Sequence, residues 1–174
     1  MITIVGFLSR PHGYNALCGI INNSNYKLLK VFTHKLKPKS EDSSRSERDD
    51  YILFKQICRK NNIPLEAIDS NSQIINNVPQ CDFIVEISWR YLISQEIVKQ
   101  ASTLTFGVHR GKLPEYAGSE PIKQALEKNE SKIVLSSHHL AEEIDSGGTI
   151  NTISHLVNYD NSKSLDVNVQ RLRN

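Results

Sequence analysis

The sequence predicts an α/β fold with a mainly parallel sheet of about six or seven strands flanked by helices. Short apolar, β-prone runs recur along the whole chain, and segments with helical spacing of apolar residues separate most of them. Polar side chains follow several of these runs directly, as they do at the carboxyl edge of a parallel sheet. Strands that alternate with helices are typical of parallel sheets with right-handed crossovers.

The amino-terminal part predicts two strands and a helix. Residues 2–8 form the first expected strand, and a turn at residues 9–13 leads into a short helix. A second β-prone run covers residues 26–34. Residues 35–50 are polar and show no apolar periodicity, which predicts a mobile, solvated connection.

A second helix is expected after this connection. Ser46 and Asp49 resemble a capping box, and apolar residues then recur at helical spacing from Tyr51 to Cys58. Short strands are predicted at residues 63–68 and 81–87.

The remaining elements follow the same alternation. Apolar residues at helical spacing predict a helix over residues 92–101, and a strand then runs into His109. Pro121 is a residue type that opens helices, and a β-prone run begins at residue 133. A last helix is expected within residues 158–174.

Length and composition indicate a single globular domain over residues 1–174. Hydrophobic residues make up 39% and charged residues 23% of the chain, and the net charge is +2. Scattered basic residues and this small charge argue against a nucleic-acid partner. The three cysteines are far apart, which favours reduced thiols and no metal site. Without an apolar run of about 20 residues or a basic leader, we expect no membrane partner and a cytoplasmic location.

Two segments end in side chains that are suited to acid–base chemistry. Residues 103–121 contain an apolar run that stops at His109, followed by a loop rich in Gly and Pro. Residues 133–150 contain another β-prone run and then an acidic loop with Asp145 before a glycine turn. If both strands are parallel members of one sheet, His109 and Asp145 lie close together at its carboxyl edge.

These segments resemble the formyltransferases that use 10-formyltetrahydrofolate, and the resemblance implies a Rossmann-like fold. Its matched elements are His109, Leu113 to Gly118, Pro121, Ser136 with His138, and Ile144 to Gly147. The chain departs from the family at Gly107, where the family has its catalytic asparagine. Because family members usually continue into a second domain, the chain is expected to be a minimal or truncated version.

The resemblance implies that His109 stabilises a developing oxyanion or moves a proton, while Asp145 orients its ring. Gly107 has two interpretations. Its backbone N–H replaces the missing amide in one, and activity has been lost in the other. His138 is either a substrate-pocket residue that compensates for the glycine or a wall residue without a chemical role.

The resemblance also implies two binding regions. The folate is expected between the loop at residues 88–92 and the loop at residues 141–145, whereas Trp89 and Tyr91 have an equally good interpretation as packing residues. A substrate phosphate is a weaker expectation at the end of the first strand. The folate candidates are Ser88, Trp89, Arg90, Tyr91, Leu92, Glu142, Glu143 and Ile144, and the substrate candidates are Arg10, His12 and His138.

The predicted activity is formyl transfer from 10-formyltetrahydrofolate to a primary amine of a small molecule, with a nucleotide-linked amino sugar as the first choice. The loop after the first strand lacks the glycines of purine formylation, and no RNA-binding appendage is evident. Two alternatives are open: a formyltetrahydrofolate hydrolase, and a binding module for folate or an amino sugar without turnover. The oligomeric state cannot be read from the sequence.

Overall fold

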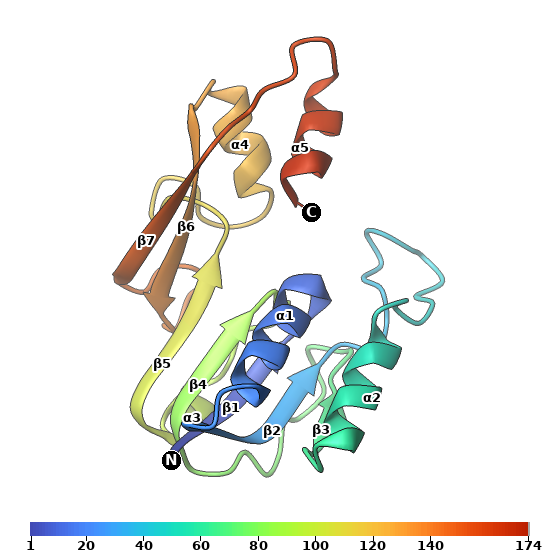
Figure 1. The fold of residues 1–174 in the computed structure, drawn as a ribbon, viewed down its shortest axis with the longest axis vertical. Helices are drawn as coiled ribbons and strands as arrows, with labels where there is room; N and C mark the ends of the chain where they lie inside the picture. The colour runs from blue at the N-terminus through green and yellow to red at the C-terminus, as the bar shows by residue number, and fades with distance from the viewer. Residues whose placement is uncertain (174) are drawn as a thin grey trace. The chain divides into compact units, whose positions relative to one another are not determined.

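A computed structural model describes residues 1–173 of the chain. Its strands form a seven-stranded sheet in the order β3-β2-β1-β4-β5-β6-β7. Strand pairs β1–β2, β1–β4 and β2–β3 are parallel, and β6–β7 is antiparallel. The predicted α/β fold with a mainly parallel sheet is therefore confirmed (Figure 1). The elements are β1 (Ile2–Leu8), α1 (Arg10–Ile21), β2 (Tyr26–Thr33), α2 (Tyr51–Lys60), β3 (Leu65–Ala67), β4 (Cys81–Ile87), α3 (Gln95–Val98), β5 (Ala101–His109), α4 (Pro121–Glu127), β6 (Lys132–His139), β7 (Thr149–Leu156) and α5 (Leu165–Arg173).

The chain divides into two compact units, with the boundary between Phe106 and Gly107 inside β5. The first unit contains β1 to β4 with α1 to α3, and the second contains β6 and β7 with α4 and α5. One catalytic domain over the whole chain stays a prediction.

The first unit is built around β1, which is paired on both sides. Val5, Phe7 and Leu8 are fully buried, as expected for a central parallel strand covered on both faces. Helix α1 packs on β1, β2 and β4 through residues that include Leu17, and α2 adds Phe54 to the same core (Figure 1). Cys18, Cys58 and Cys81 are free thiols, and burial raises the pKa of Cys58 to about 11.

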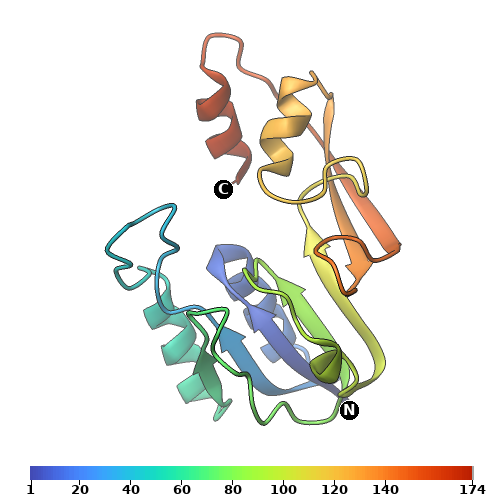
Figure 2. The same ribbon diagram turned by 180° about the vertical axis from the view of Figure 1, so that it is seen from behind.

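Three expectations for this unit were wrong. Ser46 does not cap α2, because that helix begins after Asp50, and the Ser46 hydroxyl instead donates to Asp42. The helix predicted over residues 92–101 shrinks to the four residues of α3, which lies in the segment after β4 (Figure 2). The turn expected at residues 9–13 is instead the start of α1, which begins at Arg10. Residues 35–50 form an irregular and mostly exposed connection, as expected, although Arg48 within them is buried.

The second unit is a hairpin of β6 and β7 with α4 and α5 beside each other (Figures 1 and 2). Helix α4 begins at Pro121, whose fixed φ and missing N–H suit a first helical position. The core of the second unit combines Ile122 and Leu126 of α4, Ile133 of β6 and Val169 of α5. Within residues 1–173, no helix is long and apolar enough to cross a membrane.

Candidate active site

His109 ends β5, and both of its ring nitrogens face hydrogen-bond acceptors. Nε2 lies 2.6 Å from the backbone oxygen of Tyr116, and Nδ1 lies 3.2 Å from Oδ2 of Asp145. A carbonyl only accepts, so Nε2 carries a hydrogen and Nδ1 is the nitrogen opposite the carboxylate. The imidazolium form donates to both acceptors. Nε2 is therefore held by the Tyr116 carbonyl, and Nδ1 is the nitrogen that faces Asp145.

Asp145 is fixed by the backbone as well as by His109. Its Oδ2 accepts a hydrogen bond of 2.9 Å from the N–H of Gly118. Asp145 has φ 56°, a left-handed conformation that Asp tolerates better than most residues. Its side chain is only 13% exposed, so water screens its attraction to His109 weakly. The sequence placed these two residues together, and the structure brings them into contact.

His138 on β6 approaches the same carboxylate from another direction. Its Nδ1 lies 3.0 Å from the backbone oxygen of His139, and its Nε2 lies 3.5 Å from Oδ1 of Asp145. Nε2 is buried and has no hydrogen-bond partner among the described residues. A buried polar atom without a hydrogen-bond partner is costly, so this nitrogen is a point where a bound ligand can supply the missing partner. Ser136 and His138 are both buried, although Ser136 serves the loop described next.

Residues 110–118 connect β5 to the rest of the unit, and Ser136 secures this loop. The Ser136 hydroxyl donates to the oxygen of Gly111 at 2.8 Å and accepts from the N–H of Leu113 at 3.3 Å. Sequence reasoning missed the parts played by Ser136, Tyr116 and Gly118, since two of them act through backbone groups. The only signal was their place in the matched motif.

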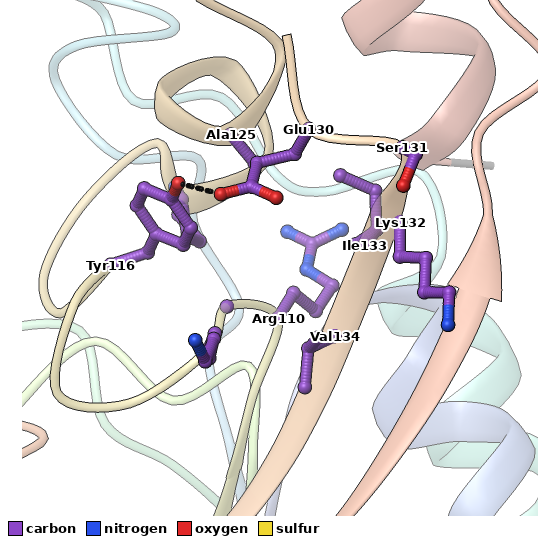
Figure 3. Close-up of a pocket in the computed structure, with 11 residues that line it drawn as sticks. Arg110, Tyr116, Ala125, Glu130, Ser131, Lys132, Ile133 and Val134 are labelled. Carbon is purple, nitrogen blue, oxygen red and sulfur yellow. Dashed lines mark hydrogen bonds between the residues drawn. The ribbon is translucent and has the colours of Figure 1, made fainter. Parts of the chain in front are cut away.

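A cavity of about 230 Å³ is lined in part by residues of this loop, among them Gly111 and Tyr116 (Figure 3). Arg110 points between Glu130 and Ile133, and the Tyr116 hydroxyl donates to Glu130 at 2.6 Å. This hydrogen bond raises the pKa of Tyr116 to about 12. A Cβ on Gly111, which also lines the cavity, would lie 2.8 Å from Nε2 of His109. Gly111 is therefore both part of the cavity wall and close to Nε2 of His109.

Gly147 is required by the turn that carries Asp145. A Cβ at this position would lie 1.8 Å from the backbone oxygen of His139, whereas one on Gly148 would be no closer than 4.0 Å to the side chain of His139. We expect Gly147→Ala to lower the free energy of unfolding by about 1–3 kcal/mol or more, because the backbone must shift. Thermal unfolding checks this, with Gly148→Ala as the matched control. Equal melting temperatures for the two variants would contradict the expectation.

The predicted folate loop at residues 88–92 belongs to the first unit and is partly packed inside it. Trp89 stacks on His34 with ring centroids 4.1 Å apart and meets Phe7 edge-on. Leu92 is 48% exposed. Trp89 Nε1 and Arg90 Nη1 are buried and have no hydrogen-bond partner among the described residues. Ser88 has φ 57°, so the loop starts with a sharp turn.

The other predicted binding residues lie apart from His109 in sequence and are partly exposed. Arg10 is the first residue of α1 and forms an ion pair with Glu41, while His12 lies one half-turn further along. Glu142, Glu143 and Ile144 precede Asp145 in an exposed loop.

Gly107 is a buried residue of β5 and lies on the same strand face as His109. The roles assigned to all these residues stay predictions.

Comparison with known proteins identifies the family. A family model described as formyl transferase matches residues 12–172. Methionyl-tRNA formyltransferase of Sulfurihydrogenibium sp. (strain YO3AOP1) is 27% identical over 129 residues, which are 71% of this chain and 40% of that protein. Formyltetrahydrofolate deformylase 2, mitochondrial, of Arabidopsis thaliana is 31% identical over 104 residues, which are 58% of this chain and 32% of that protein. The chain thus spans less than half the length of these two relatives.

A solved structure shows the same fold. The crystal structure of WlaRD, a sugar 3N-formyl transferase studied in the presence of dTDP and 5-N-formyl-THF, superposes with a TM-score of 0.65 at 21% identity. The alignment covers 99% of this chain and 59% of that one. The Rossmann-like formyltransferase fold implied by the sequence is confirmed. With a family model that matches nearly all of its residues, the chain belongs to the formyl transferase family.

Proposed function

We propose that the chain transfers a formyl group from 10-formyltetrahydrofolate to the primary amine of a small molecule. The observation that carries this proposal is His109, held through Nε2 by the Tyr116 carbonyl with Nδ1 3.2 Å from Asp145. An imidazole held in place beside a poorly exposed carboxylate offers two groups that exchange protons at one point. Acyl transfer to an amine needs both.

The reaction assigns a task to each group. The amine nitrogen forms a bond to the formyl carbon, and negative charge develops on the formyl oxygen. A protonated His109 ring stabilises this charge through its own positive charge, while its Nδ1–H stays directed at Asp145. Asp145 accepts the proton that the amine loses. When the bond between the formyl carbon and N10 of the folate breaks, the proton passes through this pair to N10, so the pair ends as it began.

The residues present fit a folate donor. Pterins carry carbonyl and ring-nitrogen acceptors. The loop at residues 88–92 holds two buried donor atoms, Trp89 Nε1 and Arg90 Nη1, that have no hydrogen-bond partner within residues 1–173. We propose that this loop contacts the folate. Gly107 is proposed to supply its backbone N–H to the formyl oxygen in place of an asparagine side chain, since a glycine allows close approach.

The proposed acceptor is a nucleotide-linked amino sugar. Support comes from the similarity to a sugar 3N-formyl transferase and from the loop after β1, which lacks the glycine-rich sequence expected for purine formylation. A second candidate is hydrolysis of the folate, which the similarity to a formyltetrahydrofolate deformylase favours. In that reaction water takes the place of the amine at the same His109–Asp145 pair.

One incubation distinguishes these functions. The protein is mixed with 10-formyltetrahydrofolate and a panel of dTDP- and UDP-linked amino sugars, with glycinamide ribonucleotide as a further acceptor. Mass spectrometry measures formylated amines, and a coupled assay measures free formate. A formylated amino sugar is the expected result. Formate without a formylated amine would establish the hydrolase instead. If neither product forms, the binding module is the remaining alternative.

A further inference from the structure

His34 is a buried histidine outside the acid–base pair, and it contacts three successive residues of the loop at 88–92. Its ring stacks on Trp89 with centroids 4.1 Å apart and an interplanar angle of 22°. Its Nε2 accepts the N–H of Arg90 at 3.1 Å. Tyr91 meets the same ring edge-on at 5.1 Å. A single imidazole therefore contacts the Trp89 ring, the Arg90 N–H and the Tyr91 ring.

The orientation of His34 is fixed from its other side. Nδ1 donates to the backbone oxygen of Ile68 at 2.5 Å, so Nε2 has no hydrogen and can accept. The ring is fully buried at the end of β2. Burial, reinforced by the nearby charges of Arg90, Arg48 and Arg10, lowers the pKa of His34 to about 3. Near neutral pH the ring is uncharged, as its role as acceptor from Arg90 requires.

The Arg90 side chain ties the same loop to the residues after His34. Its Nη2 donates to the oxygen of Leu36 at 2.8 Å and lies 3.6 Å from Asp69. Asp69 in turn accepts the N–H groups of Lys35 and Leu36. Arg48 donates to the oxygen of His34 at 2.8 Å and forms a two-point ion pair with Asp50. The loop at 88–92 thus rests on a buried polar network with His34 at its centre.

We infer that His34 is a positioning residue for the folate: it sets the backbone of residues 89–91 in the conformation that receives the pterin. This inference rests on the proposed function, in which that loop contacts the donor. The Arg90 N–H is already bonded to His34, so it is excluded as a hydrogen-bond donor to the pterin. The ring acts through the loop and takes no part in the transfer of the formyl group.

The test compares two replacements of His34. His34→Phe keeps an aromatic ring against Trp89 but removes both hydrogen bonds, which leaves the Arg90 N–H and the Ile68 oxygen without partners. His34→Gln keeps a donor for Ile68 and an acceptor for Arg90. Affinity is measured with 5-formyltetrahydrofolate, a stable folate, by calorimetry and by the fluorescence of Trp89, the only tryptophan of the chain.

We expect His34→Phe to weaken folate binding about 10-fold to 100-fold and to shift the emission of Trp89. His34→Gln should bind more tightly than His34→Phe, and kcat at saturating folate should stay close to that of the wild type for both. Leu17→Val is the control, since Leu17 is buried in the same unit's core but is not a neighbour of the loop in sequence. It should lower stability without changing folate affinity.

The outcomes separate two failures. A wild-type protein that binds no folate would overturn the proposed function. Folate binding that is unchanged in His34→Phe, or weakened equally in Leu17→Val, would overturn the positioning role alone. A lower kcat with unchanged affinity would also contradict it, because the residue would then act on the chemical step.

Discussion

His109→Ala is expected to lower kcat/KM for formyl transfer by about 100-fold to 10,000-fold, the range that one positioned acid or base contributes. The variant loses the donor at Nδ1 and the anchor to the Tyr116 carbonyl. Asp145→Asn should cause a loss of similar size, because it keeps an oxygen for the Gly118 N–H but cannot accept a proton. Steady-state kinetics with the acceptor found in the incubation above provide the measurement.

The double variant makes this test sharper. If His109 and Asp145 act as a unit, His109→Ala combined with Asp145→Asn should be about as slow as the slower single variant. His139→Ala is the matched control, since this histidine lies on the neighbouring strand with an exposed side chain. Activity that survives in His109→Ala, or losses that multiply in the double variant, would contradict the proposed mechanism.

Gly107→Asn is expected to raise kcat by up to about 1000-fold, the effect of one side-chain donor to an oxyanion. Residues 107 and 109 share a face of β5, so an amide at 107 would project to the same face as the His109 side chain. The rate and the folate affinity are measured together. A faster enzyme with unchanged affinity would mean that the glycine weakens the native activity.

Gly107→Leu is the control for this substitution, because leucine is close to asparagine in shape but has no amide. It should not raise the rate. If both variants lose folate affinity, the buried position admits only glycine, and the close approach of its backbone is then what the site requires.

The fold was predictable because its signals are local. The segments of β1 and β4 are rich in apolar residues, as is typical of buried parallel strands, and Pro121 marks the start of α4. The segment at residues 92–101 misled because its helical spacing of apolar residues arises from packing in an irregular stretch, of which only Gln95–Val98 is helical. Short apolar patterns do not distinguish these cases.

The candidate site divides in the same way. The sequence by itself determined that His109 and Asp145 are neighbours, because both follow β-prone runs whose carboxyl ends meet at one edge of a parallel sheet and both fall in the matched motif. Only the tertiary structure decided which nitrogen of His109 is held, by the Tyr116 carbonyl, and how Gly118 fixes Asp145. It also decided that His34 supports the loop at residues 88–92. These contacts use backbone groups, which every residue carries, so no pattern of side chains in the sequence predicts them.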